Sequence, residues 1–279
     1  MEMQEAIKAW EELEIKDDFM FAKVMQDKKL CKKLLERLLQ TKIRDIVYLE
    51  EQKSINIEKD AKSIRLDVYI EDGNRVFDLE MQTTDKRNLP KRSRYYQGMI
   101  DLNTIEKGEN YKKLKESYVI FICTFDPFHQ GKAQYTFENF CIEDKELKLN
   151  DGAKKIFFNA KDYINAEDEE IREFLKYVNG EKSDSAFVKE IEDRVAQIKA
   201  SEEWRLEYMT LLMREQEIWE EAEEKGRKMG REEGREEGRE EGIRGTVTLL
   251  KELNIPLQTI LVKIQQQYNL SPEASKKYL

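Results

Sequence analysis

The residues of this chain that are best suited to chemistry are two acids and an amide in the segment from Arg65 to Gln82. Asp67 lies in one apolar stretch, and Glu80 and Gln82 lie in the next. Carboxylate oxygens are the ligands that Mg²⁺ prefers, and a metal ion held in this way can activate water for attack on a phosphodiester. The segment therefore predicts a site for metal-dependent hydrolysis.

The two stretches are predicted to be the strands of a hairpin. Residues 63–70 and 75–82 are rich in β-branched and aromatic side chains, and a turn signal, 71–74, separates them. With the turn centred on Gly73-Asn74, paired residue numbers sum to about 147, which sets Asp67 across from Glu80 or nearly so. Because successive residues alternate faces, Gln82 shares the face of Glu80, and Met81 points into the core. From spacing alone, an ordinary polar hairpin face explains the pattern equally well.

A basic patch follows the hairpin and favours the chemical interpretation. Between Lys86 and Gln97 the chain carries no acid and five cations, which are Lys86, Arg87, Lys91, Arg92 and Arg94. Acids next to cations that can hold phosphate are the combination expected of a nuclease. Arg94 and Gln97 lie one helical turn apart, so they would share a face and could contact phosphate or water.

The surrounding pattern predicts a mixed sheet with helices on its faces. Short helices are expected at 17–25 and 30–39, and a helix that starts near Pro90 should pack on the sheet through Tyr95, Met99 and Leu102. Further strands are expected at 46–49, 118–123, 135–141 and 155–158. After residue 160 the strand signals end, and charged helices are expected at 168–178 and 186–224.

Glycines recur every four residues at positions 226, 230, 234, 238 and 242. Each glycine costs a helix roughly 1 kcal/mol relative to alanine, so this repeat predicts either close helix-helix contact or a solvated, partly frayed linker. The tail from Thr246 to Leu279 is predicted to be a small helical module, with Ser271 as the cap of a last short helix. A helix-turn-helix-like role in DNA recognition is the alternative, although the tail carries few cations.

Composition excludes several classes of protein. The chain of 279 residues has a net charge of −9, and we find no targeting segment or long apolar run, so we expect an intracellular protein. Three cysteines without ligand spacing and a single histidine, His129, argue against a zinc site. The acidity is uneven, because residues 1–160 carry 29 Lys and Arg against 30 Asp and Glu, which leaves most of the negative charge in the C-terminal part.

The ordered set of motifs resembles the recombination-promoting nuclease and transposase group of the PD-(D/E)XK nuclease superfamily. The resemblance covers most of the chain. It rests on Asp18–Phe21, Arg65–Val68, Leu79–Gln82, Leu89–Arg92, Arg94–Gln97, the glycine repeat and Leu270–Glu273. It implies a restriction-endonuclease-like α/β fold, in which a mixed sheet is flanked by helices and followed by an all-helical C-terminal region.

The resemblance also implies roles for individual residues. Asp67, Glu80 and the backbone carbonyl of Met81 would ligate Mg²⁺ or another divalent cation, with Asp67, Glu80 and Gln82 as the catalytic set. Gln82 stands where the superfamily usually has a lysine, and a neutral amide can only orient water and donate a hydrogen bond. Asp18, or its neighbour Asp17, could serve as an outer acid, although a helix cap is at least as good an explanation.

The expected partner is double-stranded DNA, and its phosphates would contact four cations, Lys86, Arg87, Lys91 and Arg92. No association with a membrane is expected. We expect a nuclease domain at 1–160, a helical region at 161–225, the charged repeat at 226–245 and the tail module at 246–279, with homo-oligomers possible through the helical region. The expected function is a DNA endonuclease of the bacterial cytoplasm and nucleoid that promotes recombination or element movement. The alternatives are an inactive DNA-binding or oligomerising transposase remnant and a phage-defence nuclease.

Overall fold

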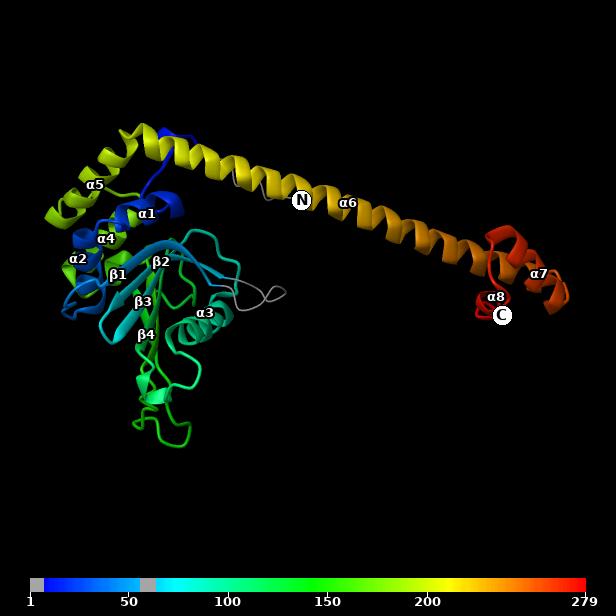
Figure 1. Cartoon of the computed structure of the whole chain (residues 1–279), viewed down its shortest axis with the longest axis horizontal. Helices are drawn as coiled ribbons and strands as arrows, with labels where there is room; N and C mark the ends of the chain where they lie inside the picture. The colour runs from blue at the N-terminus through cyan, green and yellow to red at the C-terminus, as the bar shows by residue number, and fades with distance from the viewer. Residues whose placement is uncertain (1–7, 56–63) are drawn as a thin grey trace. The chain divides into compact units, whose positions relative to one another are not determined.

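The computed structural model describes residues 8–55 and 64–279, with the side chains of 8–47 and 67–279 (Figure 1). The chain divides into two compact units, one ending at Tyr208 and the other spanning Met209–Leu279. Strands are β1 (Tyr48–Ile55), β2 (Ile64–Asp72), β3 (Arg75–Gln82), β4 (Glu116–Cys123), β5 (Gln134–Phe137) and β6 (Ala153–Asn159). Helices are α1 (Asp18–Met25), α2 (Lys28–Leu39), α3 (Leu89–Thr104), α4 (Glu169–Val178), α5 (Ala186–Lys199), α6 (Glu202–Glu252), α7 (Leu257–Tyr268) and α8 (Pro272–Lys276).

Strands β2 and β3 form the predicted hairpin. Asp72 pairs with Arg75 across a two-residue turn, and the antiparallel register continues to Val68 opposite Leu79. Gly73 has a φ of +56°, a conformation that favours glycine and suits this tight turn. The register confirms the expected pairing, and Met81 is buried as expected, with 6% of its surface exposed.

One mixed sheet carries the described strands in the order β1-β2-β3-β4-β6-β5. Pairing is antiparallel from β1 to β3, parallel from β3 through β4 to β6, and antiparallel again at β5. The expected strand at 135–141 is shorter than predicted, because β5 ends at Phe137 and only Phe140 makes a further isolated bridge. A restriction-endonuclease-like α/β fold is thereby confirmed.

Helix α3 covers one face of the sheet, and its buried side is rotated from the predicted one. Tyr96, Met99 and Ile100 pack against Val119 and Phe121 of β4. Tyr95 is 39% exposed and Leu102 is 61% exposed, so the predicted contact face through these two residues was wrong. The helix begins at Leu89 with Pro90 in its first turn, where a missing N–H is tolerated, as predicted.

Helices α1, α2, α4 and α5 lie on the other side of the sheet from α3 (Figure 1). Their buried side chains include Phe21 of α1, Leu34 and Leu35 of α2, and Phe174 of α4, each almost without exposed surface. The helix expected at 186–224 is divided in two, because α5 ends at Lys199 and α6 starts at Glu202. The sheet between these layers is therefore buried on both faces.

The second unit consists of most of α6 with α7 and α8. Its core joins Ile243 and Val247 of α6 to Ile260 and Ile264 of α7. Ser271 accepts a hydrogen bond from the N–H of Ala274 and caps α8, as predicted. No helix in the described part of the chain is both long and apolar enough to cross a bilayer.

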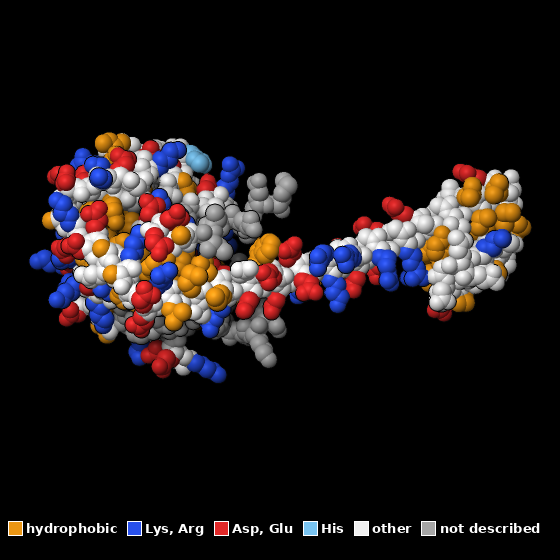
Figure 2. Space-filling model, turned by 90° about the horizontal axis from the view of Figure 1, so that it is seen from above, with side chains coloured by type: hydrophobic (Ala, Val, Ile, Leu, Met, Phe, Trp, Pro, Cys, Tyr) orange, Lys and Arg blue, Asp and Glu red, His pale blue; other side chains and the backbone are white. Residues whose placement is uncertain are grey.

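The glycine repeat lies within the continuous helix α6. Residues 213–241 are exposed, and Figure 2 shows charged side chains of both signs along this stretch. A Cβ added at Gly226, Gly230, Gly234 or Gly238 would meet nothing within 4 Å, whereas one at Gly242 would lie 3.5 Å from the hydroxyl of Tyr268. Only the last glycine of the repeat is thus packed against another element of the described chain.

Candidate active site

The site begins where the backbone pairing of the β2–β3 hairpin ends. The last backbone pair is Val68 with Leu79, and the next residue on each strand is Asp67 and Glu80. At these two residues, side-chain carboxylates replace backbone carbonyls as acceptors of the hydrogen bonds between the strands. The N–H of Asp67 donates to Oε1 of Glu80 at 3.0 Å, and the N–H of Met81 donates to Oδ2 of Asp67 at 3.1 Å. Each carboxylate is therefore fastened to the backbone of the opposite strand, which brings the two together.

Arg92 of α3 covers the site on the face of the sheet against which α3 packs. Its Nη2 donates to Oε2 of Glu80 at 2.7 Å, and its Nη1 donates to Oε1 of Gln82 at 2.6 Å. Its Nε donates to the hydroxyl of Tyr96 at 2.7 Å. Glu80 has no exposed surface, so the guanidinium compensates a carboxylate that water does not reach.

A third acid, Asp78, belongs to the same cluster, and the sequence-based prediction did not single it out. Asp78, Glu80 and Gln82 alternate along β3 and so share one face, a period-two signal that could have identified Asp78. Asp78 is fully buried, and neither carboxylate oxygen has a hydrogen-bond partner in the described structure. Tyr96, also missed, lies four residues after Arg92 and therefore on the same side of α3.

The three carboxyls hold their protons more tightly than usual. Burial, followed by the charges of Glu80 and Asp18, raises the pKa of Asp67. Burial and the neighbouring Asp78 raise the pKa of Glu80, although Arg92 opposes the change. Burial and the charge of Asp67 raise the pKa of Asp78. The cluster thus has more negative charge than Arg92 alone offsets.

The donor set fits a hard divalent cation. Asp67 and Glu80 offer carboxylate oxygens, and the carbonyl of Met81 follows an N–H that already contacts Asp67. No group of three or more His, Cys, Asp or Glu side chains within the described residues is arranged as a metal cage. Magnesium is often bound by one or two carboxylates together with water and substrate phosphate, so two carboxylates and a carbonyl suffice. A divalent charge would also relieve the repulsion among the three acids.

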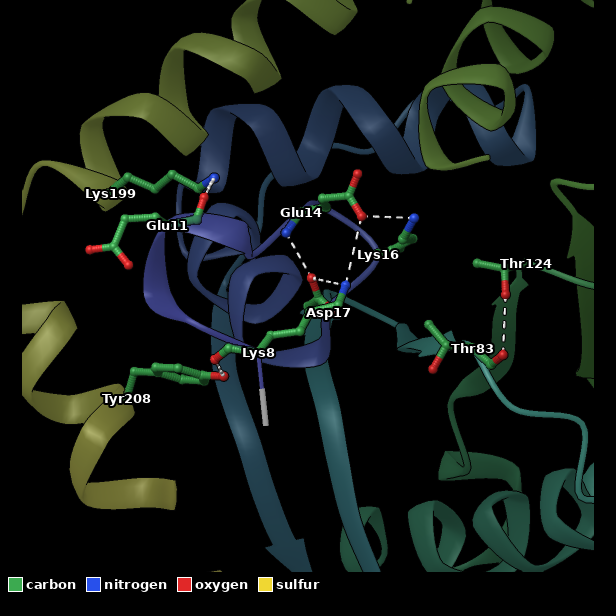
Figure 3. Close-up of polar contacts among 9 residues, drawn as sticks. All are labelled: Lys8, Glu11, Glu14, Lys16, Asp17, Thr83, Thr124, Lys199 and Tyr208. Carbon is green, nitrogen blue, oxygen red and sulfur yellow. Dashed lines mark hydrogen bonds and ion pairs between the residues drawn. The ribbon is translucent and has the colours of Figure 1, made fainter. Parts of the chain in front are cut away.

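The two acids at the start of α1 have different surroundings. Asp17 accepts hydrogen bonds from Nζ of Lys8 at 2.8 Å and from the N–H of Glu14 at 2.7 Å (Figure 3). Asp18 is the first residue of the helix, is exposed, and is close enough to Asp67 to raise the pKa of that carboxyl. Of the two, the structure therefore brings Asp18 and not Asp17 toward the cluster.

Arg94 and Gln97 lie outside the cluster. Arg94 is exposed, and Nε2 of the buried Gln97 donates to Oγ of Ser117, at the start of β4. Since Ser117 pairs with Val76 in the parallel register, this contact lies about four residues along the sheet from Glu80. The structure does not bring either side chain to the acids.

The cations before and at the start of α3 lie beside the carboxyl ends of β3 and β4. Lys86, Arg87 and Lys91 are exposed, unlike Arg92. The hydroxyl of Thr124 donates to the carbonyl of Thr83 at 3.3 Å and ties the two strand ends together (Figure 3). Arg87 and His129 line a hollow of about 410 Å³ in this region, and Asp85 lies in the same lining.

Comparison with known proteins agrees with this arrangement. No curated protein and no solved structure matches the chain. A family model described as PD-(D/E)XK nuclease family transposase matches residues 15–232, which include the hairpin, α3 and the start of the glycine repeat. The chain therefore belongs to the PD-(D/E)XK nuclease family transposases.

Proposed function

We propose that this protein is a metal-dependent endonuclease that hydrolyses phosphodiester bonds of double-stranded DNA. The observation that carries the proposal is the pair of carboxylates, Asp67 and Glu80, each bonded to the backbone of the other's strand, with Glu80 also paired to Arg92. Asp67, Glu80 and the carbonyl of Met81 would hold the divalent cation, with Mg²⁺ as the first candidate. The bound ion would lower the pKa of a water molecule and neutralise charge on the phosphate.

The protein's own groups would prepare the site in three ways. Asp67 and Glu80 are fixed before any ligand binds, so little reorganisation is needed when the ion enters. The amide of Gln82, held by Arg92 and by the carbonyl of Thr84, would orient water rather than accept its proton. Asp18 could serve as an outer acid from α1.

The DNA backbone would lie along the exposed cations Lys86, Arg87 and Lys91, which follow the hairpin directly. We propose that the activity supports recombination or movement of a genetic element on DNA of the bacterial cytoplasm. Self-association through the second unit would bring two sites to one DNA and would allow both strands to be cut in one complex.

Conversion of supercoiled plasmid tests the proposal. The full chain should nick or linearise plasmid in Mg²⁺ but not in EDTA, and Asp67→Asn should lower the rate more than about 100-fold, because removal even of groups that merely support metal ligands costs 10–100-fold. Asparagine keeps an oxygen acceptor for the N–H of Met81, so the hairpin should remain closed. Asp101→Asn is the matched control, since Asp101 is a half-buried aspartate of α3 outside the cluster.

Equal cutting by wild type and Asp67→Asn would exclude this site. Salt-sensitive binding of DNA without cleavage under any divalent cation would instead identify a DNA-binding remnant that keeps the fold without the activity.

A further inference from the structure

Position 82 has a neutral amide, but a cation is present beside it. Nη1 of Arg92 lies 2.6 Å from Oε1 of Gln82, and Nη2 of the same guanidinium lies 2.7 Å from Oε2 of Glu80. The planar guanidinium thus bridges two side chains that are two residues apart on one face of β3. A positive charge is therefore delivered to this part of the site from α3.

Arg92 is held in this place from several sides. Besides Glu80 and Gln82, it contacts the hydroxyl of Tyr96 through Nε, and its guanidinium lies 5.0 Å from the ring centre of Tyr96 and 5.5 Å from that of Phe121. Its side chain is 29% exposed. Such a residue differs from the exposed Lys86, Arg87 and Lys91, which are free to follow a phosphate backbone. These contacts therefore favour a fixed role in the site over the simple phosphate contact that the basic patch predicted for Arg92.

The hydrogen bond from Arg92 also decides which way the amide of Gln82 faces. A guanidinium only donates hydrogen bonds, so Oε1 of Gln82 must face Arg92. The amide nitrogen then faces the other way, where it donates to the carbonyl of Thr84 at 2.9 Å. Without Arg92 the amide could rotate and exchange its donor and acceptor ends.

We propose that Arg92 is a positioning residue that fixes Gln82 and Glu80 and supplies the positive charge that the neutral amide of Gln82 lacks. This inference rests on the proposed nuclease function. An arginine stays protonated at all relevant pH values, so it would stabilise negative charge and fix Gln82 but would not take a proton from water. Arg92 would then supply the positive charge of this part of the site, and Gln82 would supply the amide that orients water.

A charge-exchange experiment tests the proposal in the full chain. Arg92→Gln should lower kcat by about 10²–10³-fold, the usual effect of removing one preorganised donor. Gln82→Lys alone should also impair the enzyme, because it places a second cation against Arg92. The double variant Gln82→Lys/Arg92→Gln returns a single cation to the site and should recover at least about tenfold of the lost kcat. A double variant no faster than Arg92→Gln would overturn the proposal.

Two measurements separate this role from simpler ones. If Arg92 only bound phosphate, Arg92→Gln would weaken DNA binding, reduce its salt slope by about 1 and leave kcat at saturating DNA unchanged, which would overturn the proposal. Affinity for Mn²⁺, measured without DNA, should be equal or tighter in Arg92→Gln, since a cation next to Glu80 has been removed. Mn²⁺ binding weakened in proportion to kcat would show that Arg92 only supports the ligands, and would also overturn it.

Further variants guard against misfolding and against confusion with the nuclease proposal. Arg92→Lys keeps the charge, should fold, and should have a kcat between those of wild type and Arg92→Gln; a kcat as low as that of Arg92→Gln would count against the inference. Arg172→Gln, on α4, is the control for loss of a half-buried arginine elsewhere. A wild type that does not cut refutes the nuclease proposal, whereas failure of the charge exchange in an active wild type refutes only the role of Arg92.

Discussion

Replacing the exposed glycines of α6 by alanine should stabilise the helix in this region by an amount that the structure allows to be estimated. At Gly230, Gly234 and Gly238 an added Cβ meets nothing within 4 Å, so no steric cost opposes the change. Alanine is favoured over glycine in a helix by about 1 kcal/mol per residue, which gives about 3 kcal/mol for the triple variant. Each 1.4 kcal/mol is a factor of ten in an equilibrium, so local opening should become about 100-fold rarer.

Hydrogen exchange of the full chain measures this directly. Protection of the amides at 227–241 should rise about 100-fold in the triple variant, while amides of α3 should not change. Met229→Ala is the matched control, because it alters an exposed side chain of the same segment with little change in helix propensity. Unchanged or reduced protection in the triple variant would refute the reasoning. Reduced protection in particular would mean that these glycines pack closely against another helix in solution.

Three further predictions concern the first compact unit, which ends at Tyr208. Mn²⁺ or Mg²⁺ at 100 times its Kd should stabilise the wild type against thermal unfolding by about 2.7 kcal/mol and leave Asp67→Asn unaffected, and an equal rise in both would place the ion elsewhere. Burial raises the pKa of Asp126, but hydrogen bonds from Gly131, Phe128 and Tyr135 outweigh this effect and lower it. The stability that Asp126 contributes is therefore complete above the unfolded pKa of about 3.9 and is lost as the pH falls through the lower folded pKa. Asp126→Asn should cost about 2 kcal/mol at pH 7 in a urea titration, and this difference should vanish at low pH; a difference independent of pH would contradict the assignment. Phe121→Ala removes a large side chain from the hydrophobic core between α3 and the sheet, so it should lower the free energy of unfolding by about 3–5 kcal/mol in the same titration. A loss under about 1 kcal/mol would show that the neighbouring side chains repack to fill the space.

The hairpin was predictable because its determinants are local. Gly73 and Asn74 fix the turn, the turn fixes the register, and alternation then determines which residues share the face of Glu80. The same rule applied to Asp78 would have added it to the cluster. A charged residue in an apolar strand is easily taken as solvent-facing, yet α3 covers this face and leaves Asp78 fully buried.

The contacts of α3 were not predictable in the same way. Tyr95 and Tyr96 are adjacent and chemically identical, so a shift of one residue in the helical phase exchanges the buried and exposed ring. That phase decides whether Arg92 faces the sheet or solvent, and it depends on how the whole helix packs on β4. For this reason we propose for Arg92 a role other than the phosphate contact that the basic patch predicted.

In the exposed stretch of α6, the structure has a more regular helix than the glycine content of the sequence suggested. Helix propensity summed over its glycines suggested fraying or a packing partner, but the arginines and glutamates between them are good helix formers. The repeat therefore continues one helix from Glu202 to Glu252 without a side-chain core around Gly230, Gly234 and Gly238.

The carboxylates of Asp67 and Glu80 join the two strands of the hairpin at the point where the backbone pairing has ended. Selection for folding alone would therefore retain a hydrogen-bond acceptor at both positions in a descendant that no longer cleaved DNA, and the amide of asparagine or glutamine would serve there as well as an acid. In such a lineage the exposed cations Lys86, Arg87 and Lys91 would be the first to change. Loss of these cations, together with exchange of the acids for amides, would mark a member of this family that no longer binds and cleaves DNA.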